Sequence, residues 1–182
     1  MRLFVAVDVP DAIKEAVERD VVRPLRDEVP GARWSRPEGR HLTLKFLGEV
    51  ADERITGVGE ALAEAASRHT GFDAAFAELG GFPNLRRPRV LWIGIGEGAD
   101  ALGALASDVE ERLRPLGFPG EDRPFRGHLT LARFPTQRIV EAIPAVAVPG
   151  AAFRVDELIL FRSQLHPKGA RYTVLERFAL GS

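Results

Sequence analysis

The tetrapeptide HLTL occurs twice in this chain, at residues 41–44 and again at residues 128–131. Successive side chains of a strand point to opposite faces. If each copy is a strand, its histidine and threonine therefore share one face, and its two leucines point into a core on the other. Each copy thus predicts a rigid strand that presents one proton carrier and one hydroxyl donor. Two such strands facing each other would surround one small anion.

Composition narrows the class of protein. The 182 residues suffice for one sizeable domain or two small lobes, and 45% hydrophobic with 28% charged residues is typical of a globular protein. The net charge of −1 creates no overall attraction to nucleic acid or acidic membranes. A polyanion would therefore have to bind at a local, positively charged patch. The absence of cysteine excludes disulfide scaffolds and cysteine nucleophiles. Without a signal-peptide pattern or a membrane-spanning stretch, we expect a cytoplasmic protein.

The order of predicted elements repeats along the chain. The first half reads as a strand at 2–7, a helix at 12–20 capped by Asp11, a strand at 41–47, a helix at 52–67 and a strand at 72–79. The second half reads as a strand at 89–95, a helix at 100–114, a strand at 128–134, a short helix at 137–143, and strands at 153–162 and 171–180. This repetition predicts two lobes related by a pseudo-twofold axis, with sequence halves of approximately 1–80 and 88–182. A turn-rich hinge is expected at residues 80–84.

Paired histidines suit metal-free cleavage of a phosphodiester. Because the unperturbed pKa of histidine is ~6.5, one ring can be neutral while the other is protonated. The neutral ring would take a proton from water, and the charged ring would give one to the leaving alkoxide. In-line displacement places these oxygens on opposite sides of phosphorus, and Thr43 and Thr130 would bind the non-bridging oxygens. The symmetry of the motif does not say which histidine is the acid.

Zinc is the main alternative for two histidines. A catalytic zinc site needs a third ligand, and no HExxH motif, adjacent aspartate or cysteine supplies an obvious one. A Ser-His-Asp triad lacks its GxSxG motif. Strand alternation places Lys45 on the face of His41 but Arg133 on the face opposite His128, unless a bend or bulge turns Arg133 toward the anion.

Other residues have two interpretations each. Phe46 and Trp92 are expected to pack in the core, although either could stack on a base. His69 and His166 are expected to be structural or on the surface. Five loop arginines could rim a cleft and meet RNA phosphates, or could simply be solvated: Arg86, Arg87, Arg89, Arg123 and Arg126.

The two motifs and their flanks resemble the two-histidine (2H) phosphoesterase superfamily. The resemblance is closest to the bacterial RNA 2′,3′-cyclic phosphodiesterases, also called 2′–5′ RNA ligases. It covers nearly the whole chain, at residues 2–6, Trp34, residues 41–48, residues 89–92, His128–Arg133, Ser163, Leu165, Gly169 and Tyr172. One departure is Gly39-Arg40, where the family often carries asparagine and an apolar residue. It bears on the loop that enters the site and therefore on substrate preference.

The resemblance implies a single domain over residues 1–182 with a bilobal α+β fold, mainly antiparallel sheet with flanking helices around a central cleft. It implies hydrolysis of terminal 2′,3′-cyclic phosphates to 2′-phosphomonoesters without metal or cofactor. His41 would be the proton donor and His128 the proton acceptor, with Thr43, Thr130 and Arg133 binding the phosphate. We expect a monomer that acts on RNA or oligonucleotide ends and not at a membrane.

Three alternatives to this hydrolase remain open. A ligase would join tRNA halves through a 2′–5′ bond by the reverse reaction, with an RNA hydroxyl in place of water. A phosphodiesterase could instead act on a small cyclic nucleotide. A non-catalytic module would bind RNA ends or nucleotides with idle histidines, although a binder would have no need of two groups that titrate near neutrality.

Overall fold

A computed structural model describes residues 1–136, 139–140, 142–167 and 169–182. Its strands are β1 (Arg2–Val7), β2 (Arg33–Trp34), β3 (Leu42–Glu49), β4 (Phe72–Ala74), β5 (Phe76–Phe82), β6 (Val90–Ile95), β7 (His128–Arg133), β8 (Phe153–Val155), β9 (Glu157–Gln164) and β10 (Arg171–Ala179). Its helical segments are α1 (Asp11–Val17), the π-helix η1 (Glu18–Val22), α2 (Arg23–Arg26), the short 3-10 turns η2 (Pro37–Gly39) and η3 (Asp52–Arg54), α3 (Ile55–Ser67), α4 (Ala99–Leu113) and the 3-10 turn η4 (Arg114–Leu116). The short helix expected at 137–143 falls on residues 137, 138 and 141, which lie outside the described residues.

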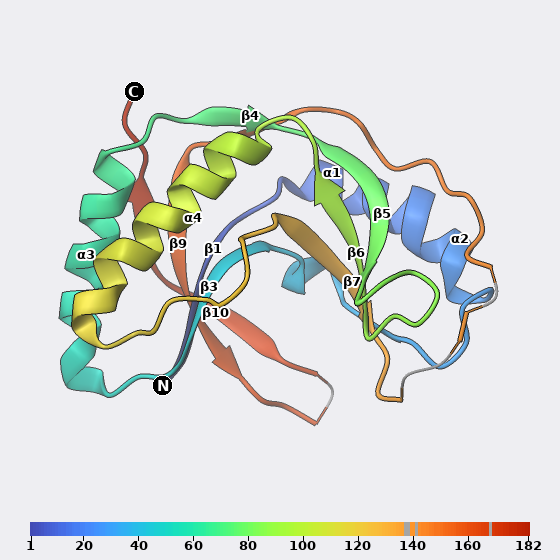
Figure 1. Ribbon diagram of the computed structural model, residues 1–182, viewed down its shortest axis with the longest axis horizontal. Helices are drawn as coiled ribbons and strands as arrows, with labels where there is room; N and C mark the ends of the chain where they lie inside the picture. The colour runs from blue at the N-terminus through green and yellow to red at the C-terminus, as the bar shows by residue number, and fades with distance from the viewer. Residues whose placement is uncertain (137–138, 141, 168) are drawn as a thin grey trace.

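One antiparallel sheet organises the molecule, in the order β10-β9-β1-β3-β7-β6-β5, with β2 added to β7 (Figure 1). A separate two-stranded sheet joins β4 to β8. The helices α3 and α4 pack together and contact β3, β9 and β10, while α1 and α2 lie at the other half of the sheet (Figure 1). The expected α+β class with mainly antiparallel sheet is confirmed.

The strand order is symmetric about the two histidine strands. At the centre, β3 and β7 share one ladder pair, Leu42 with Leu129. Outward from it, β3 is followed by β1 and β9, and β7 is followed by β6 and β5. Each part of the sheet is therefore built around one histidine strand, and β9 from the second sequence half completes the part that begins with β1 and β3. The hinge expected at 80–84 was partly wrong, because its first three residues continue β5.

The main core lies between the sheet and the helices. The leucines of both HLTL copies are buried in it, as the alternation predicted. It also contains the predicted stripe of α4, namely Leu102, Leu105, Val109 and Leu113. A second cluster, Phe4, Ala6, Ile159 and Phe161, covers the opposite face of the sheet. None of the helices in the described ranges is long and apolar enough to cross a membrane.

The first helical segment differs from its prediction. The helix begins at Asp11, with Pro10 and not Asp11 at the capping position. It continues through the π-helix η1 into α2, in which Pro24 is the second residue. The helical segment therefore extends past residue 20, where the sequence predicted its end. Val17, Val21 and Leu25 face the core along this segment.

Candidate active site

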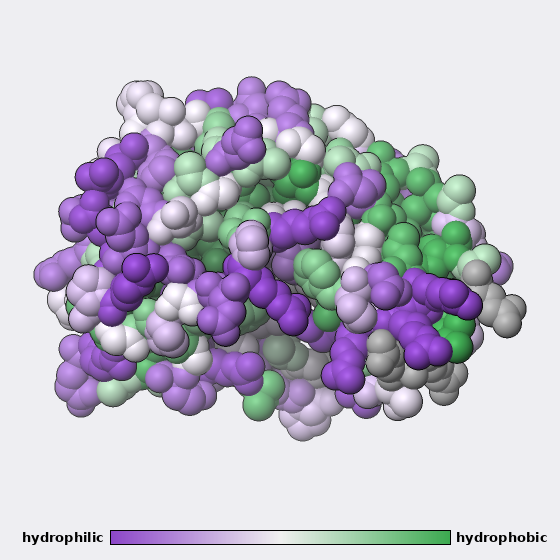
Figure 2. Space-filling model, in the orientation of Figure 1, coloured by the Kyte–Doolittle hydropathy of each residue, from purple (hydrophilic) through white to green (hydrophobic). Residues whose placement is uncertain are grey.

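The histidine face is the side of the sheet that carries Ala6, His41, Thr43, Trp92, His128 and Thr130. His41 stands immediately before β3, and His128 is the first residue of β7. Because the strands are antiparallel about the pair of Leu42 and Leu129, His41 lies beside Thr130 and His128 lies beside Thr43. Each histidine therefore faces the threonine of the other copy, as the prediction of one shared anion requires. In the space-filling view a recess opens in the lower middle of the molecule, bordered by hydrophilic side chains (Figure 2).

Both histidine strands contain a β-bulge directly after the threonine. On β3, Thr43 pairs with Ala6 and Lys45 with Val5, so Leu44 is an extra residue. On β7, Thr130 pairs with Trp92 and Ala132 with Leu91, so Leu131 is extra. One extra residue reverses the faces of all residues that follow it in the strand. Strand alternation counted from the histidine is therefore valid only as far as the bulge.

The bulge on β3 reverses two predictions. Lys45, expected on the face of His41, is buried on the opposite side, where its Nζ donates to the carbonyl oxygen of Pro119 at 2.7 Å. Phe46, expected in the core, instead lies on the histidine face, where its side chain is 61% exposed beside Phe4. The lysine thus contributes to the fold, and an aromatic ring lies at the edge of the site.

The bulge on β7 brings Arg133 to the histidine face. Arg133 pairs with Val90, which shares a face with Trp92, and the ring of Trp92 lies beside that of His128. The guanidinium is exposed and acts electrostatically on His128. Of the two orientations considered from the sequence, the structure has the one in which Arg133 shares the face of His128.

His41 is held by three neighbours. Its ring stacks on Phe161 at 4.4 Å between centroids and meets the edge of Tyr172 at 5.4 Å. Its Nδ1 lies 3.4 Å from Oδ1 of Asp8, the residue after β1. Since a carboxylate only accepts hydrogen bonds, Nδ1 carries the proton in this contact. The other ring nitrogen, Nε2, is buried without a hydrogen-bond partner among the described residues.

Asp8 is a functional residue that the sequence did not indicate. Burial alone would raise the pKa of Asp8, but hydrogen bonds from His41 and Lys14 outweigh burial and hold this pKa far below its usual range. The Lys14 ammonium lies 2.7 Å from the same oxygen. Asp8 therefore remains ionised, and its carboxylate faces Nδ1 of His41.

His128 has a different partner. Its Nδ1 lies 2.7 Å from the backbone carbonyl oxygen of Arg126, to which it donates a hydrogen bond. In the neutral ring the lone pair is consequently on Nε2. Burial is the largest influence and lowers the pKa of His128. The hydrogen bond to the Arg126 carbonyl opposes it, and the charges of Arg133 and Arg126 lower the pKa further. His128 is thus prepared to accept a proton at Nε2.

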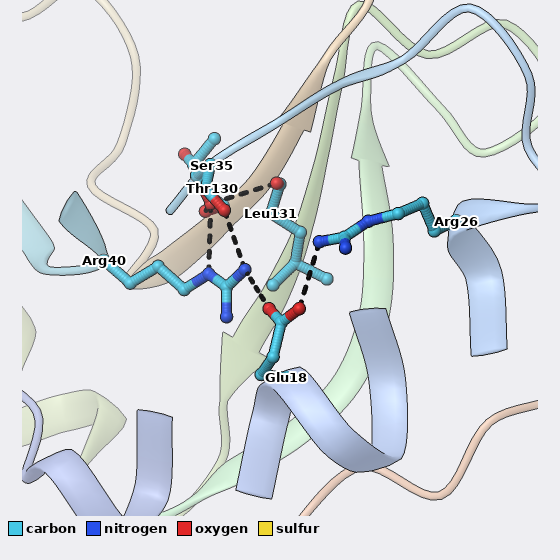
Figure 3. Close-up of polar contacts among 6 residues, drawn as sticks. All are labelled: Glu18, Arg26, Ser35, Arg40, Thr130 and Leu131. Atoms are coloured by element: carbon cyan, nitrogen blue, oxygen red, sulfur yellow. Dashed lines mark hydrogen bonds and ion pairs between the residues drawn. The ribbon is translucent and has the colours of Figure 1, made fainter. Parts of the chain in front are cut away.

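A buried arginine joins the two histidine strands (Figure 3). Arg40 donates to Oε2 of Glu18 at 2.7 Å, to the carbonyl oxygen of Ser35 at 2.7 Å and to its Oγ at 3.1 Å. Ser35 donates through its hydroxyl to the carbonyl oxygens of Thr130 and Leu131, each at 3.0 Å. These contacts link the residue before His41 to the bulge of β7. The departure from the family pattern at Arg40 therefore lies beneath the site and not on its surface.

The remaining candidates lie around or away from the site. The loop arginines Arg86, Arg87, Arg123 and Arg126 are exposed, and the Arg126 guanidinium stacks 4.7 Å above the Trp92 ring. His69 contacts Asp108 at 3.1 Å in a surface hollow between α3 and α4, and is structural as expected. His166 is exposed in the loop between β9 and β10. Within the described ranges, no three His, Asp or Glu side chains are grouped so that they could hold a metal ion.

Comparison with known proteins places this site in a family. Residues 9–167 match the 2′-5′ RNA ligase superfamily. The RNA 2′,3′-cyclic phosphodiesterase of Archaeoglobus fulgidus is 39% identical over 181 residues, 98% of this chain and 99% of the relative. The RNA 2′,3′-cyclic phosphodiesterase of Thermus thermophilus is 38% identical over 194 residues, 99% and 90% of the two chains. The crystal structure of TT0787 of Thermus thermophilus superimposes with a TM-score of 0.83 at 32% identity, covering 99% and 98%.

These relatives match the activity expected from the two motifs. The prediction of a hydrolase for RNA 2′,3′-cyclic phosphodiesters is confirmed by the names of the curated relatives, which this chain matches over nearly its full length. The family match likewise confirms the resemblance to two-histidine phosphoesterases. The chain belongs to the 2′-5′ RNA ligase superfamily.

Proposed function

We propose that His41 and His128 hydrolyse the terminal 2′,3′-cyclic phosphate of an RNA, with His41 as the acid and His128 as the base. The observation that carries this assignment is the contrast between their Nδ1 partners. Nδ1 of His41 faces the ionised carboxylate of Asp8, a charged acceptor. His128 faces a neutral carbonyl oxygen, and burial favours its neutral ring.

The proposed reaction is one in-line displacement. Nε2 of His128 takes a proton from water as the water oxygen forms a bond to phosphorus. The bond from phosphorus to O3′ breaks, and Nε2 of His41 gives its proton to O3′. The product is a 2′-phosphomonoester, and the two histidines return to their initial states by exchanging protons with solvent. Thr43, Thr130 and Arg133 bind the non-bridging oxygens, on which negative charge increases.

The proposed substrates are RNA or oligonucleotide ends that carry the cyclic phosphate, and the proposed active species is a monomer. Joining of tRNA halves is the same displacement with an RNA 5′-hydroxyl in place of water: its oxygen forms the bond to phosphorus, O3′ leaves, and a 2′–5′ phosphodiester results. Hydrolysis and ligation require the same two proton carriers. The product formed from a cyclic-phosphate end in the presence of a 5′-hydroxyl RNA therefore distinguishes hydrolysis from ligation.

The direct test uses an oligonucleotide ending in a 2′,3′-cyclic phosphate, incubated in EDTA. We expect a 2′-phosphate product and a bell-shaped dependence of the rate on pH. The variants His41→Ala and His128→Ala should each abolish turnover and remain folded by circular dichroism. His69→Ala is the matched control, because His69 contacts Asp108 away from the histidine face, and it should retain activity. Wild-type rates in either active-site variant would refute the proposal, and binding without turnover would favour a non-catalytic module.

A further inference from the structure

Two arginines stand directly opposite each other beside the proposed site. Arg33 of β2 pairs with Arg133 of β7, and cross-strand partners point to the same face. Both side chains are exposed. Neither forms a hydrogen bond or an ion pair with any other residue in the described part of the chain. Like charges directly opposite each other destabilise a sheet, and an anion between them would remove that repulsion.

The arginine pair lies at the His41 end of the site. Arg133 follows Thr130 on β7, and Thr130 lies beside His41 because of the antiparallel register. Because Leu131 is an extra residue, Thr130 and Arg133 pair with residues only two apart on β6, a separation of roughly 7 Å along the strand. Phe46 lies at the other end, beyond Thr43 on β3 and beside Phe4. The proposed phosphate site therefore has a basic end and an aromatic end.

The stereochemistry of ribose indicates which anion reaches the basic end. In a 2′,3′-cyclic phosphate, C3′ is bonded to C4′, which carries C5′ and the 5′ phosphate. C2′ is bonded to C1′, which carries the base. When O3′ lies at His41, as in the proposed reaction, the 5′ side of the nucleotide extends toward the arginine pair. The base then extends toward Phe46, whose ring is exposed.

We propose that Arg33 and Arg133 together bind the phosphate on the 5′ side of the terminal nucleotide. Guanidinium groups suit this role, because their planar donors bind phosphate oxygens in pairs. The inference rests on the proposed function and refines its substrate class. Nucleotides and oligonucleotides with a 5′ phosphate or phosphodiester are preferred over nucleoside cyclic phosphates with a free 5′ hydroxyl.

The test compares adenosine 2′,3′-cyclic phosphate with its 5′-phosphorylated form, and it changes Arg33 because Arg133 is also assigned to the cyclic phosphate. Wild-type protein should have a kcat/KM about tenfold or more higher for the 5′-phosphorylated substrate, as for a charged hydrogen-bonded contact. Arg33→Gln should reduce this ratio to near one, mainly through KM, and lessen the salt dependence for the phosphorylated substrate. Arg33→Lys, which keeps the charge but not the paired donors, should give an intermediate ratio.

Arg19→Gln is the matched control, because Arg19 is an arginine of η1, on the helical side of the sheet, and pairs with Asp20. It should leave the substrate ratio at the wild-type value. Hydrolysis of both substrates with equal kcat/KM in wild-type protein, or with an unchanged ratio in Arg33→Gln, would overturn this site and leave the proposed function intact. Hydrolysis of neither substrate, nor of the oligonucleotide, would overturn the proposed function itself.

Discussion

The two histidine strands have the same sequence, the same bulge and different neighbours. The position opposite His128 on β6 is Gly94. The corresponding position opposite His41 follows the pair of Val7 and Leu42 at the end of β1, and it is Asp8. One copy therefore places a carboxylate beside its imidazole, while the other places a residue without a side chain there.

This difference shows how a symmetric frame can support an asymmetric reaction. The frame presents two imidazoles from equivalent positions, and each has a different hydrogen-bond partner at Nδ1. The aromatic contacts differ as well: Phe161 stacks on the face of His41, whereas Phe82 meets His128 edge-on at 5.0 Å and 88°. The two histidines are therefore distinguished by residues outside the repeated motif.

The residues after the two bulges differ in the same way. Phe46 and Arg133 occupy corresponding positions, three residues beyond the threonine of their strand. One is an exposed ring, and the other is an exposed cation. A nucleotide has a flat base on one side and a charged backbone on the other, so the proposed substrate would meet two chemically different ends of the site.

The largest expected effect follows from breaking the connection between the two strands. Arg40→Met removes the buried guanidinium and leaves Glu18 and Ser35 without its donors. Loss of one partner of a buried ion pair costs about 3–5 kcal/mol. Denaturant unfolding should show this decrease in the free energy of unfolding. Arg26→Met is the control, because its exposed contact with the same Glu18 should contribute about 1 kcal/mol or less. Equal losses in both variants would show that Arg40 has no special linking role.

The threonines test whether the symmetric part of the site acts symmetrically. Thr43→Ala and Thr130→Ala should each lower kcat about ten- to a thousandfold, as for one lost donor to a developing negative charge. Thr173→Ala, at an exposed position of β10, should not change kcat. A loss confined to one of the two site threonines would show that the asymmetry extends to phosphate binding, and no loss in either would remove both from the site.

The motif predicted the two strands and their leucine core, because these depend on local alternation. Alternation failed at Lys45 and Phe46, since a bulge adds a residue that no sequence pattern marks here. Asp8 was missed because its contact with His41 arises from the pairing of β1 with β3, which are far apart in the chain. The sequence repeat likewise did not predict that β9, from the second half of the chain, pairs with β1 of the first half.

Asp8→Asn should make His41 resemble His128. The variant replaces the anion that Nδ1 of His41 faces with a neutral amide, so the proposed proton donor loses its charged partner. The rate at neutral pH should fall about ten- to a hundredfold, part of what general acid catalysis contributes. The measurement is kcat/KM against pH. Lys14→Met is the control, because it removes the salt bridge but keeps the Asp8 carboxylate, and its rate should fall less than that of Asp8→Asn. A profile unchanged in Asp8→Asn would exclude His41 as the acid that Asp8 controls.

The smallest expected effect concerns the acidic limb of the pH–rate profile. The Arg126 charge lowers the pKa of His128, while its backbone carbonyl accepts the Nδ1 proton. Arg126→Gln removes the charge and keeps the carbonyl, so the pKa of His128 should rise and the acidic limb should shift slightly to higher pH. Arg123→Gln, at an exposed position three residues earlier, is the matched control and should leave the limb in place. A shift of the basic limb in Arg126→Gln would reverse the assignment of acid and base, because the limb that follows His128 would then be the one set by the proton donor.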